Sequence, residues 1–408
     1  MSRIVEAIVP TRLGHPFRWL LGSSWVSNLG DGIALAAGPL LVASQTRDPF
    51  LVAMAVVLQR LPWLLFGLLA GVVADRFDRR RVVILVNAGR TVVLGILSTT
   101  IALDQVNTGV VLVALFLLGT AETFADTTST TLLPMVVDKR DLPVGNARIM
   151  AGFATVNQLV APPLGAALFA LHAVVPFVVQ AVCMTGSALL VSRVALPAHG
   201  VDKAARSHIR REIADGMRWL WGNAPVRTLA ITIVAFNVTF GAAWSVLVLY
   251  AIERLHMGEV GFGLLTTAGA VGGLLATGVY GRLTARVSLG NLMRAGLIIE
   301  TFTHLALALT TVSWIALLIM VVFGAHAFVW GTTSTSVRQR AVPMELQGRV
   351  GSVYLIAVQG GVVVGSVLGG FIAGAWGVVA PFWFAFVGSA VLVALVWRQL
   401  PHIAHAEE

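Results

Sequence analysis

The chain has 408 residues, of which 57% are hydrophobic and only 12% are charged, and its formal net charge is +9 at pH 7. A soluble domain carries about twice this share of charged residues, so the composition excludes a soluble protein and predicts an all-α membrane protein in contact with the lipid bilayer. The basic residues lie in short segments between apolar runs, which indicates membrane orientation and lipid contact rather than binding of nucleic acid. The single cysteine, Cys183, excludes a disulfide framework and a cysteine metal site within the chain.

Twelve apolar runs follow one another along the chain, and each is long enough to cross a bilayer as a helix, which takes about 20 residues. They cover residues 17–43, 50–73, 82–103, 109–133, 147–171, 173–194, 226–252, 260–282, 289–311, 313–336, 349–373 and 377–398.

The basic residues are distributed unevenly between the two sides of the predicted membrane. The odd-numbered connections between the runs contain only Arg47 and Arg254, out of 28 Lys and Arg in the chain. Because basic connections remain on the cytoplasmic side, the sequence predicts a multi-pass protein of the cytoplasmic membrane with both termini in the cytoplasm.

The longest break between apolar runs, residues 195–225, is predicted to be a cytoplasmic linker. It contains an amphipathic helix whose apolar face consists of Ile209, Ile213, Met217, Leu220 and Trp221. The linker separates an N-terminal six-helix bundle (1–194) from a C-terminal six-helix bundle (226–408).

The two halves are related by an internal repeat. Four motifs recur in the same order: Asn28 and Gly32 as Asn237 and Gly241 (offset 209), 71–79 as 278–286 (offset 207), 127–130 as 332–335 (offset 205), and 161–166 as 365–370 (offset 204). Parallel repeats of this kind place a solute site between the halves, near the middle of the membrane.

A strongly charged hinge, GVVADRFDRRR (71–81), joins the second and third runs. It resembles the signature that follows the second span in the major facilitator superfamily, which has glycine where this chain has Asp78; the matching residues are Gly71, Asp75, Arg76, Arg79 and Arg80. The resemblance extends over essentially the whole chain. The segments SNLGDG (27–32) and QRLPWLLFGLLAG (59–71) are similar to the branch that includes the enterobactin exporter and bacterial drug–proton antiporters.

This resemblance implies twelve helices in two pseudo-symmetric six-helix bundles that transport a small molecule by alternating access. It also implies that Asp75 forms a gating latch with the eleventh span; the alternative is that the hinge only fixes membrane orientation. In the fifth run, Pro162 and Gly165 match the antiporter signature Gly-Pro-x-x-Gly-Gly, in which Ala161 and Ala166 here replace glycines.

Ionisable residues inside membrane spans are costly and indicate function. Such residues are Asp31, Glu122, Asp126, Arg60, Arg90 and His326. Counted along the helices from their cytoplasmic ends at about 1.5 Å per residue, Asp31 and Glu122 lie at roughly 20 Å and Arg90 and Asp126 at roughly 12–14 Å. Arg60 is therefore predicted to reach Asp31 or Glu122, and Arg90 to reach Asp126.

Three acids against two arginines leave one carboxyl without a fixed partner, and such a carboxyl can bind a proton. The hypothesis is that these residues, together with His326, couple protons to substrate. The alternative is that Asp31–Arg60 and Asp126–Arg90 are static buried pairs that fix helix packing, and that His326 is an ordinary packed histidine. Glu300 and His304, one turn apart, are expected to bond each other or a neighbouring helix.

These features predict a secondary active exporter that moves small amphipathic or cationic organic molecules outward as protons flow inward. The chain is predicted to act as a monomer, without a cofactor or a metal, and not as an enzyme, because it contains no phosphate-binding loop and no hydrolase motif. Two alternatives remain open. One is an exporter of an endogenous metabolite such as a siderophore or a lipid, and the other is a membrane scaffold or sensor that does not transport.

Overall fold

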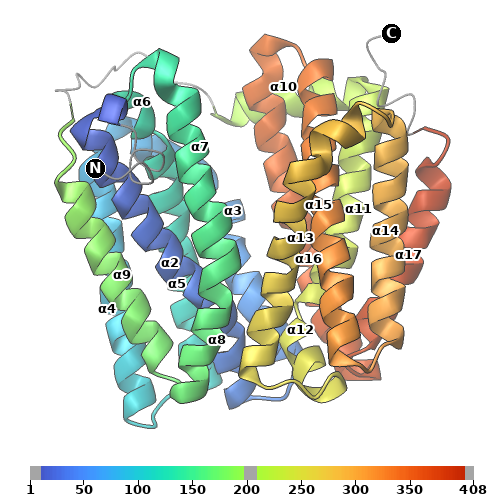
Figure 1. Ribbon diagram of the computed structural model, residues 1–408, viewed down its shortest axis with the longest axis horizontal. Coiled ribbons are helices and arrows are strands. Elements are labelled where there is room, and N and C mark those ends of the chain that lie inside the picture. The colour runs from blue at the N-terminus through green and yellow to red at the C-terminus, as the bar shows by residue number, and fades with distance from the viewer. Residues whose placement is uncertain (1–10, 197–208, 400–408) are drawn as a thin grey trace. The chain divides into compact units, whose positions relative to one another are not determined.

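The computed structural model describes residues 11–196 and 209–399, and all regular elements of these residues are helical (Figure 1). The longer helices are α2 (Gly14–Gln45), α3 (Pro49–Arg76), α4 (Arg79–Ala102), α5 (Thr108–Thr130), α7 (Leu142–Gly152), α8 (Ala161–Leu171), α9 (Val175–Ser192), α10 (Ile209–Gly222), α11 (Ala224–Trp244), α13 (Glu259–Thr284), α14 (Leu289–Leu309), α15 (Ser313–Ala341), α16 (Gln347–Trp376) and α17 (Ala380–Val396). Short helices are α6 (Leu133–Val136), α12 (Leu247–Leu249), the 3₁₀ turns η1 (Thr11–Leu13), η2 (Lys139–Asp141) and η5 (Met344–Leu346), and the π-helices η3 (Phe153–Val160) and η4 (Tyr250–Arg254).

The described helices are those of a membrane protein. Eleven helical segments are long and apolar enough to cross a bilayer, and α17, with 17 residues, is a shorter apolar helix. Each of the twelve apolar runs in the sequence coincides with one of these segments. Large apolar side chains such as Leu85, Leu171 and Val182 are exposed, as expected where lipid rather than water surrounds the protein.

The chain divides into two compact units. Unit 1 comprises Met1–Gln45 and Leu61–Ala205, and unit 2 comprises Thr46–Arg60 and Arg206–Glu408. The first part of α3 is thus grouped with the C-terminal helices. There the ring of Phe50 lies 4.6 Å from that of Phe371.

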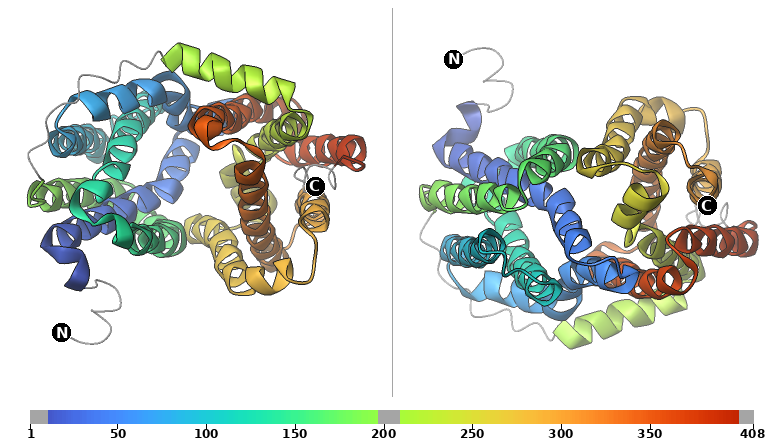
Figure 2. Two further views of the ribbon diagram at one scale, coloured as in Figure 1. Left: turned by 90° about the horizontal axis from the view of Figure 1, so that it is seen from above. Right: turned by 90° about the horizontal axis from the view of Figure 1, so that it is seen from below.

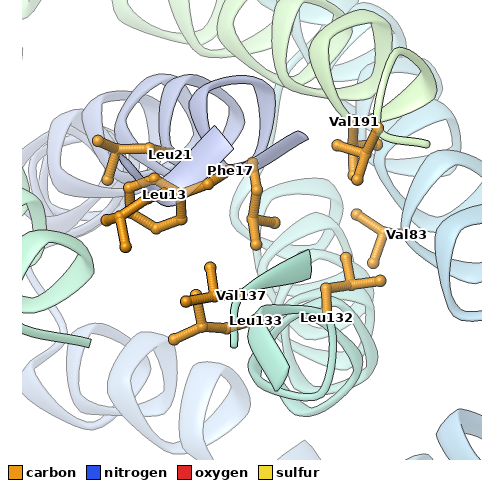
Figure 3. Packing of buried hydrophobic residues seen from close by; sticks show 10 residues of the cluster. Leu13, Phe17, Leu21, Val83, Leu132, Leu133, Val137 and Val191 are labelled. Atoms are coloured by element: carbon orange, nitrogen blue, oxygen red, sulfur yellow. The ribbon is translucent and has the colours of Figure 1, made fainter. Parts of the chain in front are cut away.

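In unit 1, α2 packs against α8 and α9, and α4 packs between α5 and α9. An apolar cluster joins the beginning of α2 to α6 and to the nearby ends of α4 and α9 (Figure 3). Its members are Leu13, Phe17, Leu20, Leu21, Val83, Leu132, Leu133, Val137, Val191 and Val194. This cluster holds one end of the unit together with side chains from four separate segments.

In unit 2, α11 packs along α16 and α13 packs along α15, while α14 lies against α15 and α17 (Figures 1 and 2). A buried cluster that includes Leu229, Phe236, Met293, Leu297 and Val337 joins α11, α14 and α15.

Glycines allow equivalent helix pairs to approach closely in the two units. A Cβ atom at Gly165 of α8 would collide with the backbone of Ile33 on α2. In unit 2, a Cβ atom at Gly365 of α16 would collide with the backbone of Val238 on α11. Such small residues let helix backbones touch inside a membrane.

The repeated asparagines also have the same structural role. Asn28 Nδ2 donates to the carbonyl oxygen of Ser24 at 2.8 Å, and Asn237 Nδ2 donates to that of Ile233 at 2.8 Å. Both bonds run back one turn along the first helix of the glycine-mediated pair. The repeat found in the sequence therefore corresponds to a repeat of local structure.

Asp78, at the position where the superfamily signature has glycine, begins α4. Its carboxylate accepts a hydrogen bond from the backbone N–H of Arg81 at 2.9 Å, which satisfies one of the free donors at the helix start. Its φ of −60° is ordinary for any residue, so this turn does not require glycine. In the second half, Ser288 caps α14 in the same way, through the N–H of Asn291.

A helix, α10, lies within the predicted linker and packs against α16. Gly216 and Leu220 are buried, and a Cβ atom at Gly216 would meet the backbone of Arg349 on α16. Met217 and Trp221 are exposed, and the side chains of Ile209 and Ile213 lie outside the described residues. The single apolar face stays a prediction, because exposed apolar side chains are expected where a helix lies on a membrane surface.

Candidate functional site

A buried ion pair between α2 and α4 is the centre of the candidate site in unit 1. The guanidinium of Arg90 (Nη2) bonds the carboxylate of Asp31 (Oδ1). Arg90 is 1% exposed, and the side chain of Asp31 is 14% exposed. A charge this deeply buried in a membrane protein needs a partner, and this pair supplies one.

The sequence of each helix explains why these two side chains meet. Arg90 lies on the buried face of α4, with Asn87 one turn before it and Leu94 one turn after it. On α2, Asp31 lies between Gly30, which faces α9, and Gly32, which faces the backbone of Asn157. The two glycines bring the neighbouring helices close, so that the carboxylate between them is largely enclosed.

Two further acids, Glu122 and Asp126, belong to the same site. They lie one turn apart on α5, and their charges act on Arg90, as does that of Asp31. Asp126 also feels the charges of Glu122 and Asp31. Glu122 is partly buried and Asp126 is exposed. Arg90 therefore has one carboxylate in contact, that of Asp31, and two further carboxyl groups within electrostatic range.

The predicted pairing of these charges is wrong. Arg90 forms its ion pair with Asp31 and not with Asp126, and Arg90 rather than Arg60 is the partner of Asp31. Arg60 is exposed and lies in the part of α3 that belongs to unit 2. A count of residues along each helix does not include helix tilt, and α2 runs obliquely through unit 1 (Figure 1).

A polar layer around Arg90 was missed in the sequence. Asn87 Nδ2 donates to Ser187 Oγ at 3.3 Å, and Ser23 Oγ donates to the carbonyl oxygen of Ser187 at 3.0 Å. Gln180 is also buried, on the face of α9 that meets Gly30. Small polar residues spaced along three apolar runs were the available signal for this layer.

A π-helical segment next to the site was also missed. The fifth span contains η3, in which the buried Asn157 donates to the backbone oxygen of Asn28 at 3.2 Å. π-Helical turns inside longer helices often mark functional sites. The adjacent pair Asn157-Gln158, inside an otherwise apolar run, was the sequence signal.

In unit 2, His326 contacts Glu300 of the neighbouring helix α14, with 3.4 Å between Nε2 and Oε2. Glu300 thus bonds a neighbouring helix, which is one of the two expected outcomes. Three tryptophans make contacts within the protein. Trp25 donates to the carbonyl oxygen of Arg148, Trp244 lies among aromatic rings, and Trp330 packs near Gly296.

Comparison with known proteins decides the family. The family model described as "Transmembrane secretion effector", a group of the major facilitator superfamily, matches residues 7–407. The chain belongs to this family. It is therefore a membrane transporter of the major facilitator superfamily and not an enzyme.

Relatives of this secretion effector family include named exporters. The chain is 26% identical to the multidrug efflux pump Tap of Mycolicibacterium fortuitum, over 95% of this chain and 96% of Tap. It is 24% identical to the enterobactin exporter EntS of Citrobacter koseri, over 87% of this chain and 85% of EntS, and 24% identical to that of Shigella boydii, over 95% and 94%.

Solved structures show the major facilitator fold. A variant of the nucleoside transporter NupG matches with a TM-score of 0.76 and 13% identity, over 95% of this chain and 100% of NupG. A bacterial homologue of the iron transporter ferroportin matches with a TM-score of 0.68 and 17% identity, over 92% and 98%. At these identities the likeness concerns the fold alone.

The superfamily motifs can now be located in this transmembrane secretion effector. Pro162 lies in the first turn of α8, and Gly165 forms the close contact with α2. Ala161, which replaces a signature glycine, is fully buried and contacts Gly32 of α2. The glycine that permits this contact is thus supplied by α2 instead of α8.

The hinge of this family member combines one weak ion pair with two backbone contacts. Asp75, whose side chain is 75% exposed, lies 3.7 Å from Arg79. Arg79 Nε also donates to the carbonyl oxygen of Ala74, and Arg80 Nη1 donates to that of Val194, just beyond the end of α9. These two arginines therefore fix the turn between α3 and α4, and the latch role of Asp75 remains a prediction.

Proposed function

We propose that this protein exports small amphipathic or cationic organic molecules across the cytoplasmic membrane in exchange for protons. The observation that carries the proposal is the buried ion pair of Asp31 with Arg90, which has two further carboxyl groups, Glu122 and Asp126, within electrostatic range. Carboxyl groups of this kind can bind protons or attract a cationic substrate, and competition between the two couples their movements.

The arrangement assigns a role to each residue. Arg90 is buried and holds Asp31 between α2 and α4, so this pair organises the site. Asp126 is exposed, which supports its role as the group that water or substrate reaches first. Glu122, one turn away on the same helix, is assigned the role of a second proton acceptor.

Alternating access by two related bundles, 1–194 and 226–408, fits the repeat of glycine-mediated helix pairs and of the backbone-bonded residues Asn28 and Asn237. The concentration of Lys and Arg in the even-numbered connections supports cytoplasmic termini. We further propose that one chain is sufficient for transport, because the candidate site in unit 1 consists of residues of a single copy. His326 is assigned to coupling through its contact with Glu300.

A second candidate is export of one endogenous metabolite, such as a siderophore. The likeness to EntS at 24% identity supports it. Arg90 also has two buried nitrogens, Nε and Nη1, without a hydrogen-bond partner among the described residues, and these could donate to an anionic cargo. A cationic substrate would be drawn to the acids, whereas an anionic one would compete with Asp31 for Arg90.

Efflux from membrane vesicles tests the proposal. Inside-out vesicles containing the wild-type protein should accumulate a fluorescent cationic dye when a proton gradient is imposed. Asp31→Asn and Glu122→Gln should abolish or strongly reduce this accumulation. Asp104→Asn is the matched control, because Asp104 lies in an exposed connection with a φ of 54°, which asparagine tolerates.

The vesicle assay has two outcomes that oppose the proposal. Proton-driven accumulation that is unchanged in Asp31→Asn and Glu122→Gln would remove the acids from coupling. No dye accumulation in wild-type vesicles, together with accumulation of a siderophore, would favour the second candidate, and no transport of either would favour a scaffold or sensor.

A further inference from the structure

Three ionisable side chains meet inside unit 2, away from the acids of unit 1. Glu300 on α14 and His326 on α15 face each other, with 3.4 Å between Oε2 and Nε2. His304 follows Glu300 by one turn on the buried face of α14. The exposed fractions are 7% for Glu300, 5% for His326 and 0% for His304.

Aromatic rings enclose these groups. The ring of Trp244, on α11, lies 5.7 Å from that of His304 in an edge arrangement with an interplanar angle of 87°. Phe323 lies 5.7 Å from His326 and 4.6 Å from Trp244. The surroundings are therefore apolar, and charge within them must be balanced locally.

Much of the hydrogen-bonding capacity of the cluster is unused. Both ring nitrogens of His304, and Nδ1 of His326, have no partner among the described residues. Buried polar groups in folded proteins are nearly always satisfied, so three such atoms in one cluster require an explanation. A histidine with a purely packing role would be expected to bond a carbonyl or a hydroxyl group.

The remaining ionisable residues of the surrounding helices have other positions or partners. Arg294, on α14, donates to the carbonyl oxygen of Trp397 and stacks on its ring at 4.9 Å. α17 has no ionisable residue between Ala380 and Val396. Those of α11, α13 and α15 lie towards the helix ends: Arg227, Glu259, Tyr280, Arg282, Arg338 and Arg340. Bound protons therefore determine the net charge of the cluster.

We propose that Glu300, His304 and His326 form a second proton-binding site of this transporter. With one proton shared between Glu300 and His326 the cluster is neutral; without it the carboxylate would be an unbalanced charge in an apolar enclosure. Protons on both His304 and His326 would repel each other, so binding of one proton opposes binding of a second. The site thus holds one exchangeable proton, and His304 is the alternative base beside the pair.

The role of this site in coupling rests on the proposed proton-driven export, whereas proton binding itself does not. Proton binding is measured on the purified full-length chain in nanodiscs, with ¹⁵N-labelled histidine, by NMR across about pH 5 to 9, where histidine titrates. In the wild type, the His326 ring should change protonation within this range. Glu300→Gln should remove the charged form of His326, and His326→Gln should remove its signal.

Exposed residues provide the controls for this experiment. His172→Gln and His256→Gln remove exposed histidines and should leave the remaining signals in place. Glu253→Gln removes an exposed glutamate near the beginning of a connection and should leave the His326 titration unchanged. If Glu300→Gln does not reach the membrane, His304→Gln supplies the comparison, because with the alternative base removed the proton can reside only on the pair of Glu300 and His326.

Two results would overturn the inference. One is a His326 ring that stays neutral throughout the range in the wild type and in His304→Gln. The other is a His326 titration that is identical in wild type and Glu300→Gln. In that case the contact between Glu300 and His326 would serve only to pack α14 against α15. A transport assay distinguishes the failure of this inference from the failure of the proposed function. If Glu300→Gln shows proton-driven efflux with normal proton dependence, this site does not take part in coupling. If the wild type shows no efflux, the proposed function is refuted, but the NMR result on proton binding still stands.

Discussion

Helix α16 offers a matched pair of glycines that tests the close contact between α11 and α16. A Cβ atom at Gly365 would lie 2.8 Å from the carbonyl carbon and 2.9 Å from the Cα of Val238, and nearer still to its oxygen. A Cβ atom at Gly360, five residues earlier, would meet nothing within 4 Å. Substitution by alanine at the two positions thus adds the same methyl group to one helix, once into a backbone contact and once into open space.

The expected energies follow from this geometry. Alanine is favoured over glycine inside a helix by about 0.8–1.0 kcal/mol, and this gain applies to both substitutions. At Gly365 the helices must separate by more than half an ångström to restore ordinary contact at 3.4 Å, and the obstacle is backbone that has no rotamer to change. Overpacking of this kind costs about 1–3 kcal/mol. Gly365→Ala should therefore be less stable than Gly360→Ala by about that amount.

Thermal unfolding of the purified protein in detergent, followed by tryptophan fluorescence, measures the difference. Gly360→Ala should unfold at or above the wild-type temperature, and Gly365→Ala should unfold below Gly360→Ala. The same comparison can be made in unit 1, where Gly165→Ala meets the backbone of Ile33 and Gly71→Ala meets nothing within 4 Å. Equal unfolding temperatures for Gly365→Ala and Gly360→Ala would refute the close contact.

Three further predictions concern the charged residues. Arg90→Gln should lower the free energy of unfolding by about 3–5 kcal/mol, because it leaves the buried carboxylate of Asp31 without a charge partner. Adding Asp31→Asn to this variant should recover part of the loss. Additive losses in a double-mutant cycle would contradict the ion pair. Asp78→Ala should destabilise the start of α4 by about 1 kcal/mol, whereas Asp78→Asn should not, and hydrogen exchange at the first turn of α4 should show the difference; equal exchange would exclude the cap. Asp75→Asn should change the free energy of unfolding by less than about 1 kcal/mol, because its ion pair is exposed. The same substitution should slow transport if Asp75 is a gating latch. Unchanged transport would mean that the hinge only fixes membrane orientation.

The helices and the repeat could be predicted because they depend on features that are continuous along the chain. Every apolar run of sufficient length became a helix, since the backbone of a span must satisfy its own hydrogen bonds in lipid. The offset between Gly32 and Gly241 could be read directly, and both residues form close helix contacts.

The partners of the charged residues could not be predicted in the same way. Whether Arg90 meets Asp31 or Asp126 depends on helix tilt and rotation, which a count along the chain does not contain. The π-helical turn at Asn157 shifts the register of the fifth span, and hydropathy does not reveal it. The enclosure of His304 by Trp244 joins α14 to α11, helices whose rotation about their own axes follows only from packing in three dimensions.

The ion pair between Asp31 and Arg90 also has a consequence for how the protein is made. An acid or an arginine at the centre of a span costs roughly 2.5–3.5 kcal/mol on entry into the bilayer. The two residues are 59 positions apart, so α2 and its carboxylate are synthesised well before α4 brings the guanidinium. α2 is also less hydrophobic than α3 and α4. We expect the first span to remain loosely inserted until the third emerges, so that the N-terminal helices enter the membrane as a group and not one by one.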